Sequence, residues 1–200
     1  MVAESAIDLT NQFLIAMPGM TDDNFAGSVI YLCEHTERGA LGLVINKPSD
    51  IKLGKLFEKV ELSLDRTELA EQPVYLGGPV QTERGFVLHE SGDDDAANID
   101  ADGARYNSSL RIPGGMAMTT SKDVLEALAS GAGPKRVLVT LGYAGWGAGQ
   151  LEDEIARNGW ITVGAKPELI FETPIEQRYD RALGLLGIDA RMLSSEAGHG

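Results

Sequence analysis

The side chains with the clearest potential for chemistry are a cysteine and a histidine two positions apart, Cys33 and His35. Cys33 is the only cysteine of the chain, and a neighbouring histidine can lower the pKa of a thiol and make it a nucleophile. Alternate residues of a strand share a face, so these two are expected side by side. The residues facing them across the hairpin are predicted to be Gly42 and Ala40, respectively. His89 ends another apolar run, and it completes one candidate functional cluster.

Burial is the ordinary alternative for Cys33. A single cysteine in an apolar strand usually behaves as a small buried hydrophobic residue, and we favour this interpretation over a reactive thiol. The chain contains no Gly-x-Ser-x-Gly nucleophile elbow and no His-Glu-x-x-His helix. The sequence therefore identifies no catalytic residue, and it favours a protein that is not an enzyme.

A glycine-rich segment, residues 142–149, precedes a predicted helix, which is the position at which phosphate-binding loops occur. No lysine follows its glycines, and Gln150 occupies the place of the third glycine of a dinucleotide-binding motif. Three carboxylates in the first turn of the following helix would repel a phosphate. We therefore interpret the segment as a tight turn anchored by Tyr143 and Trp146, and we predict no cofactor.

Metal ligands are not arranged in any strong pattern. The chain lacks the Cys/His spacing of a zinc site. Residues 98–109 resemble the start of an EF-hand loop, but the first ligand would be Asn98 and the twelfth Ser109, where a bidentate glutamate is needed. This segment overlaps an acidic loop, residues 90–103, which is expected to be exposed. We predict no metal site.

Two apolar runs, residues 29–33 and 41–45, flank a polar loop with a glycine, which is typical of a β-hairpin. Both faces of these runs are apolar, so the hairpin is predicted to lie at the centre of the fold. Further strands are expected at residues 12–17, 73–76, 85–89, 136–141, 160–163 and 169–171. About four helices are expected, near residues 49–60, 120–131, 150–158 (ended by Gly159) and 174–187. This pattern predicts an α+β or mixed α/β domain rather than a doubly wound parallel sheet.

The length of 200 residues and a composition of 43% hydrophobic and 24% charged residues suit one globular domain. We expect that domain to span residues 12–189, between a flexible N-terminus at residues 1–11 and a flexible tail at residues 190–200. The start of the chain has neither a basic region nor an apolar run, so a signal peptide is not expected. No run of about 18 apolar residues suggests a membrane span. A cytoplasmic monomer is the expectation.

The formal net charge is −13, and the basic residues are scattered. A nucleic acid repels such a protein at long range unless a local basic patch overrides the total charge. Direct nucleic-acid binding is therefore not expected. The ordinary interpretation of this acidity is a solvated surface.

Several segments along residues 10–189 resemble the YqgE/AlgH family of uncharacterised bacterial proteins. Their order and spacing are specific, and the quoted motifs are Phe13-Leu-Ile-Ala-Met-Pro18, Ser28-Val-Ile-Tyr-Leu-Cys-Glu-His35, Gly42-Leu-Val-Ile-Asn-Lys-Pro48, Val74-Tyr-Leu-Gly-Gly-Pro79, Arg84-Gly-Phe-Val-Leu-His89, Leu141-Gly-Tyr-Ala-Gly-Trp146, Gly149-Gln-Leu-Glu152 and Leu183-Gly-Leu-Leu-Gly-Ile-Asp189. The resemblance implies a compact α+β domain with a mixed, mostly antiparallel sheet curled into a barrel-like core. It implies no established activity and no agreed catalytic residues, although one branch carries the label of a transcriptional regulator.

Three hypotheses of function follow. The first is a non-catalytic regulatory or interaction protein that binds a protein or small-molecule partner. The second is a cysteine-based enzyme or redox sensor that uses Cys33. The third, which rests only on the family label, is a transcriptional regulator. The first is favoured.

Overall fold

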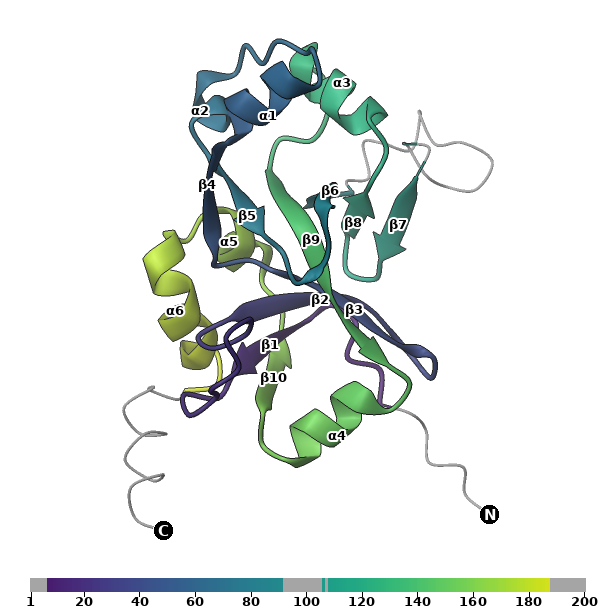
Figure 1. Cartoon of the computed structure of the whole chain (residues 1–200), viewed down its shortest axis with the longest axis vertical. Coiled ribbons are helices and arrows are strands. Elements are labelled where there is room, and N and C mark those ends of the chain that lie inside the picture. Colours follow the sequence, from purple (N-terminus) through teal and green to yellow (C-terminus); the bar gives the residue numbers. More distant parts are fainter. Residues whose placement is uncertain (1–6, 92–105, 107, 188–200) are drawn as a thin grey trace.

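The computed structural model of the chain describes residues 7–91, 106 and 108–187 (Figure 1). Its strands are β1 (Gln12–Ala16), β2 (Val29–Thr36), β3 (Gly39–Val44), β4 (Pro48–Lys52), β5 (Pro73–Leu76), β6 (Val80–Glu90), β7 (Ser109–Ile112), β8 (Met116–Thr119), β9 (Val137–Gly147) and β10 (Trp160–Gly164). Its helices are α1 (Leu53–Lys59), α2 (Thr67–Ala70), α3 (Asp123–Ala129), α4 (Gln150–Ala156), α5 (Pro167–Phe171) and α6 (Arg178–Gly184), with a 3-10 turn, η2 (Ile175–Gln177).

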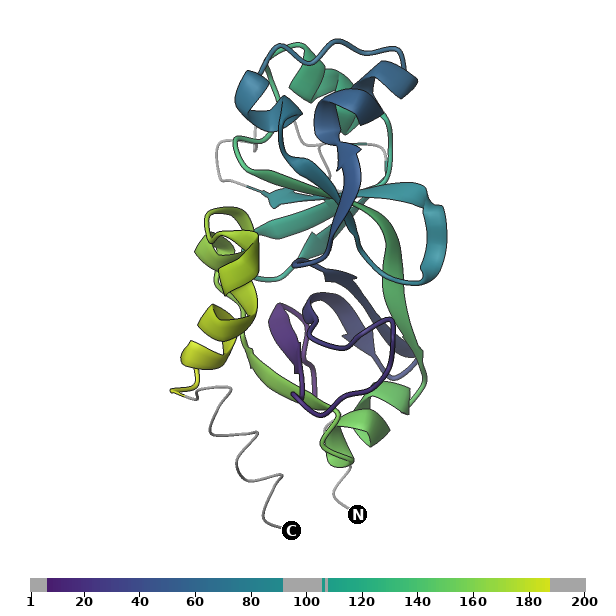
Figure 2. The same cartoon turned by 60° about the vertical axis from the view of Figure 1, so that its left-hand side comes forward.

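The strands form one sheet in the order β10-β1-β2-β3-β9-β6-β8-β7, with β4 attached through β5. The pair β5–β9 is parallel, and the other described pairs are antiparallel. The sheet curls into a half-barrel, so its two ends lie at different levels in Figure 2. The predicted α+β fold, with a mostly antiparallel curled sheet, is confirmed.

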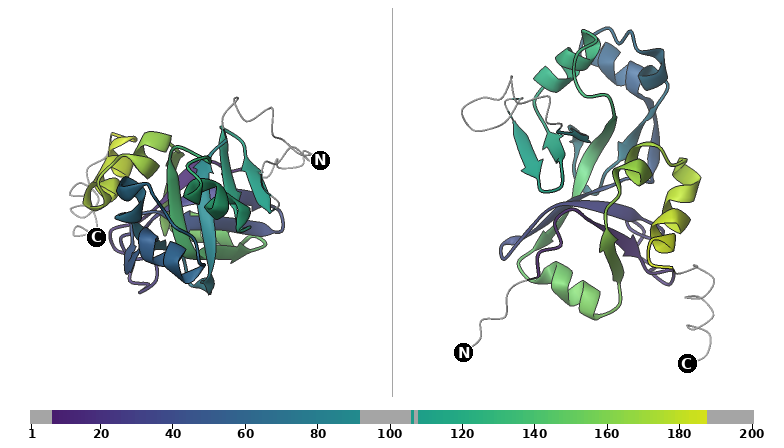
Figure 3. Two further views of the ribbon diagram at one scale, coloured as in Figure 1. Left: turned by 90° about the horizontal axis from the view of Figure 1, so that it is seen from above. Right: turned by 180° about the vertical axis from the view of Figure 1, so that it is seen from behind.

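Strand β9 runs through both halves of this sheet (Figures 1 and 3). Its first part pairs with β5 and β6, and its last part pairs with β3. The predicted tight turn at residues 142–149 is therefore wrong as far as Gly147, because the strand continues through it. Gly142 has a φ of 77°, and this left-handed residue lets the strand bend without ending.

The described residues contain six α-helices instead of about four. One addition, α5, replaces the strand predicted at residues 169–171: Pro167 lies in its first turn, and the adjacent Leu169 and Ile170 are both buried. The other, α2, lies in a segment without a predicted element. The first predicted helix starts later than expected, because Pro48–Lys52 pairs with β5 as β4. Helices α1 to α3 cover one end of the molecule, and α4 lies at the other (Figure 1).

The central hairpin predicted from the sequence is confirmed as β2 and β3, and residues 29–33 of β2 are all buried. The segment before β1 is also held in place, since Leu9 is buried and the Asn11 N–H donates to the Leu32 carbonyl at 2.9 Å. The predicted flexible N-terminus thus does not extend to residue 11. Residues 1–6, the acidic loop from residue 92 onward, most of the EF-hand-like segment and the tail at 190–200 lie outside the described residues.

Candidate functional site

Cys33 lies in the central core and is 1% exposed. Its Sγ donates to the Tyr31 carbonyl at 3.7 Å, and burial raises the pKa of the thiol. The expected pairing of Cys33 with Gly42 is wrong, because a β-bulge places Leu32 opposite Gly42. The bulge also separates Cys33 from His35, whose side chain is directed toward a different part of the core. These surroundings favour an inert thiol over a nucleophile.

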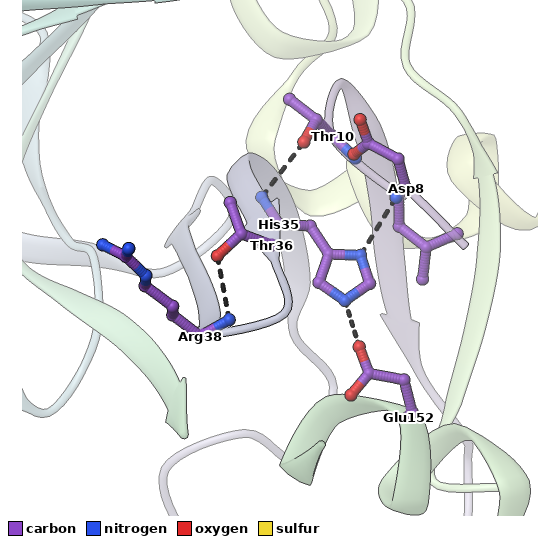
Figure 4. A network of polar contacts seen from close by, with 7 residues as sticks. Asp8, Thr10, His35, Thr36, Arg38 and Glu152 are labelled. Carbon is purple, nitrogen blue, oxygen red and sulfur yellow. Dashed lines mark hydrogen bonds and ion pairs between the residues drawn. The ribbon is translucent and has the colours of Figure 1, made fainter. Parts of the chain in front are cut away.

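His35 is buried in a polar network that connects three segments (Figure 4). The Leu9 N–H donates to Nδ1 at 3.0 Å, so in the neutral ring Nε2 carries the proton and donates to the Glu152 carboxylate. The His35 N–H donates to Thr10 Oγ1 at 3.0 Å. Both ring nitrogens are thus used, and the hydrogen bond from His35 holds the pKa of Glu152 below its usual value. His35 positions the chain before β1.

His89 has different partners at the far end of β6. Its Nδ1 lies 3.1 Å from the Glu90 carbonyl, which can only accept, so Nδ1–H donates and Nε2 accepts from the Thr119 hydroxyl at 2.8 Å. Its ring meets Tyr106 edge-on. The structure therefore places Cys33, His35 and His89 in three separate surroundings and does not bring them together as one cluster.

A hollow lies between the β1–β2 loop and the junction of α4 with β10. It has a volume of about 650 Å³, within the range of small-molecule sites. We call it the aromatic pocket, and it is lined by Met17, Pro18, Gly19, Met20, Thr21, Asp22, Phe25, Glu154, Asn158, Gly159 and Trp160.

Backbone hydrogen bonds hold the two walls of the aromatic pocket together. The Met17 N–H donates to the Gly159 carbonyl at 3.1 Å, and the Gly159 N–H donates to the Glu154 carbonyl at 2.9 Å. Helix α4 ends at Ala156, and the left-handed residue that follows it is Asn158, with a φ of 61°, instead of the predicted Gly159. Gly159 is needed for another reason: a Cβ there would lie 3.1 Å from the Glu154 carbonyl oxygen. This close approach holds the end of α4 against the start of β10.

The opposite wall is the loop between β1 and β2, and hydrogen bonds hold this loop in one shape. Asp22 Oδ1 accepts the Asn24 N–H at 2.8 Å, and the Asp22 carbonyl accepts the Ala26 N–H at 2.8 Å. Lys47 Nζ then donates to the Asn24 carbonyl at 2.8 Å. These bonds are typical of an Asx turn, in which a short polar side chain replaces a backbone group. The loop therefore holds Phe25 in a defined place.

Phe25 forms an aromatic group with both tryptophans of the chain. Its ring stacks on Trp146 with a centroid separation of 6.2 Å and meets Trp160 edge-on at 5.6 Å. The two indoles also meet edge-on, at 6.1 Å. Such geometries are favoured by the ring quadrupoles. They make this wall of the aromatic pocket apolar and rigid.

Two polar atoms in the lining have no hydrogen-bond partner among the described residues, Trp160 Nε1 and Glu154 Oε2, and both are buried. A buried donor or acceptor without a partner costs about 1–3 kcal/mol. The lining residues include no cysteine, histidine, lysine or arginine. The lining is therefore mostly apolar, which suits binding, and it supplies no nucleophile–base pair.

The sequence did not indicate this pocket. Its two walls are more than 120 positions apart in the chain, and the sequence predicts only a strand at residues 12–17 near one of them. The clustering of both tryptophans at the two ends of α4 was the one available signal, but it is equally typical of core packing. The pairing of β1 with β10 brings the walls together.

Within the described residues, no group of three or more His, Cys, Asp or Glu side chains is placed to hold a metal ion. No described helix has the length and hydropathy needed to span a membrane.

Comparisons with known proteins agree with one another. A family model described as AlgH-like matches residues 13–191. UPF0301 proteins of Burkholderia cenocepacia and Burkholderia ambifaria are 64% and 63% identical over 193 residues, which is 96% of this chain and 96% of each relative. The solution structure of the AlgH protein from Pseudomonas aeruginosa is 46% identical, covers 100% of both chains and has a TM-score of 0.74. A crystal structure of a Corynebacterium diphtheriae protein, 21% identical with a TM-score of 0.71 over 96% of this chain and 94% of that chain, shares the fold.

Proposed function

This chain belongs to the AlgH-like family, and from that premise we propose that it is a non-catalytic regulatory protein that binds a small molecule in the aromatic pocket. The resemblance found in the sequence is confirmed, but it indicates only a fold and identifies no reaction. The single observation that supports binding is the aromatic pocket, a hollow of about 650 Å³ whose walls are held in place by backbone hydrogen bonds and aromatic contacts. We place this function in a cytoplasmic monomer, as the sequence leads us to expect.

The two other hypotheses have less support. A cysteine enzyme or redox sensor needs an accessible thiolate, whereas Cys33 is buried with a raised pKa and no histidine beside it. A transcriptional regulator that contacts DNA directly needs a basic surface, whereas the net charge is −13. Regulation through a bound ligand needs neither feature.

Filling the aromatic pocket tests this function. A Cβ on Gly19 meets nothing within 4 Å, so we expect Gly19→Phe to fold and to occupy pocket space with its ring. Gly164→Phe is the matched control, because Gly164 also has open space around its Cβ and lies outside the pocket. Each protein is dialysed against a bacterial metabolite extract, and retained compounds are released by denaturation and identified by mass spectrometry.

We expect at least one compound to be retained by the wild-type protein and by Gly164→Phe, and to be lost from Gly19→Phe. Circular dichroism confirms that all three proteins are folded. If the wild-type protein retains nothing, or if folded Gly19→Phe retains the same compounds equally well, the proposed binding function is wrong.

A further inference from the structure

We infer that residues 7–10, which lie before β1, form a strap that closes on the core only while His35 is neutral, and that a proton on the His35 ring releases Leu9. This inference is independent of ligand binding in the aromatic pocket. Three observations carry it: the bonds between the strap and His35, the charges that face the ring, and the burial of Leu9.

Two hydrogen bonds hold the strap to His35. The Leu9 N–H donates to ring atom Nδ1 at 3.0 Å, and the His35 N–H donates to Thr10 Oγ1 at 3.0 Å. The first bond needs a lone pair on Nδ1, because a backbone N–H can only donate. Both nitrogens of an imidazolium carry a proton, so the charged ring presents a hydrogen to the Leu9 N–H instead of an acceptor. The second bond uses the backbone of His35 and does not depend on the charge of the ring.

Two carboxylates favour the charged ring. Glu152 of α4 accepts a hydrogen bond from Nε2, and Asp8 of the strap interacts electrostatically with His35 (Figure 4). On β3, the residue opposite His35 is Ala40, which carries no charge. The side chain of Arg38 extends away from the ring in Figure 4. The two carboxylates therefore favour proton uptake, whereas burial and the Leu9 N–H oppose it.

The release has a defined direction in pH. The closed strap occupies Nδ1 with the Leu9 N–H, whereas the open strap leaves Nδ1 free to bind a proton. The open form therefore binds more protons than the closed form, and a falling pH favours the open form. An ordinary histidine side chain changes its charge near pH 6.5, so the strap is expected to respond within the physiological range.

Opening of the strap uncovers apolar surface, because Leu9 is part of a core. Its side chain is 8% exposed and belongs to the core that contains Trp146 and Trp160. Beyond the strap, the Asn11 N–H donates to the Leu32 carbonyl at 2.9 Å, and this bond does not involve His35. We therefore expect the strap to open as far as Thr10 while β1 stays in the sheet.

Amide hydrogen exchange, followed by NMR at pH 8 and at pH 5, tests the strap. The chemical shifts of the ring nitrogens report the charge of His35 in the same samples. We expect the protection factor of the Leu9 amide to fall about tenfold as the ring gains its second proton, because one hydrogen bond is lost. The Asn11 amide is the internal control and should keep its protection.

Two variants assign the release to His35. His35→Asn places an amide oxygen near the position of Nδ1 and cannot take up a proton, so the Leu9 amide should be equally protected at both pH values. Glu152→Gln removes a carboxylate that favours the charged ring, so the midpoint of the release should move to lower pH. Asp153→Asn, at an exposed neighbour in α4, is the matched control and should move this midpoint much less.

The inference is overturned if the ring gains its second proton while the Leu9 amide keeps its protection, or if the ring stays neutral down to pH 5. It is also overturned if Leu9 and Asn11 lose protection together, since proton uptake would then unfold β1 instead of opening a strap. The wild-type protein alone decides these outcomes, so the test does not depend on the folding of His35→Asn.

Discussion

His35 shows how one buried side chain can replace missing secondary structure. Residues 8–10 belong to no strand, yet the Leu9 N–H and the Thr10 hydroxyl both bond to His35, through its ring and its backbone N–H. The ring is held in turn by Glu152 of α4. Side-chain pairing therefore satisfies the polar groups of a segment that the sequence alone led us to treat as flexible. Periodicity along the chain contains no information about such a contact, because its partners are 26 and 117 positions apart.

Replacing Glu152 should make stability less dependent on pH in the acid range. The hydrogen bond from His35 lowers the pKa of Glu152 in the folded state, so its stabilising effect is present above the unfolded pKa and is lost as pH falls through the folded pKa. Glu152→Gln should therefore be less stable than wild type at pH 7, by less than about 1 kcal/mol because the carboxylate is half-exposed.

Urea unfolding at pH 7 and at pH 3 measures this difference. The gap between wild type and Glu152→Gln should close at the lower pH. Asp153→Asn removes a charge from the same turn of α4 and leaves the hydrogen bond between His35 and Glu152 intact, so it serves as the control and should show no such closing gap. A gap that is constant with pH would assign the effect of Glu152 to packing.

At the scale of elements, β9 shows where the sequence-based description of the fold succeeds and where it fails. Residues 137–141 form a buried strand, as their apolar run predicts. The glycines that follow predict a tight turn, because they lie between that strand and the next predicted helix. They are required instead by close packing: a Cβ on Gly142 would lie 2.5 Å from the Gly78 carbonyl oxygen. Only the folded sheet brings Gly78 to that place.

Gly142→Ala should therefore lower the stability of the protein by more than the left-handed backbone conformation of this residue alone explains. Gly142 and Gly149 have nearly the same φ, 77° and 75°, so alanine costs about 1–2 kcal/mol at either position. A Cβ on Gly149 meets nothing within 4 Å, whereas on Gly142 it meets backbone. We expect denaturant unfolding to show a clearly larger loss of stability for Gly142→Ala than for Gly149→Ala. Equal losses of stability in the two variants would mean that residues 78–82 can move away from β9 at little cost in free energy.

At the scale of the whole molecule, the central hairpin, the α+β class and the family could be predicted from the sequence. The apolar runs and the quoted motifs are local signals, and the predictions of the hairpin, the fold class and the family rest on them. The bulge at Cys33, helix α5 and the aromatic pocket depend on partners distant in the chain. Leu169 and Ile170, for example, suit a strand as well as a short helix, and only packing beneath α6 distinguishes the two. The candidate site was missed for the same reason.

Because strand β9 runs through both halves of the sheet, we expect the two ends of the molecule to unfold together. Strand β9 contributes Val137 and Val139 to the core beneath α1 and α3, Leu138 to the central core, and Ala144 and Trp146 to the core that contains Trp160. A defect at one end therefore weakens the strand that the other end needs. Phe57, fully buried in α1, lies in the core without tryptophan.

Phe57→Ala should lower the free energy of unfolding by about 3–5 kcal/mol. Tryptophan fluorescence, which reports only the opposite end, should show the same shift in urea midpoint as far-UV circular dichroism, since unfolding of a domain of this size is cooperative. Phe57→Leu provides a milder change with the same expected agreement, and Leu185→Ala, at a side chain 40% exposed, should move neither signal appreciably. A fluorescence midpoint that stays at its wild-type value while circular dichroism shifts would show that the end containing the aromatic pocket is a separate folding unit. Agreement of the two midpoints would instead show that both ends unfold as one cooperative unit, as expected of a sheet whose strand β9 takes part in all three cores.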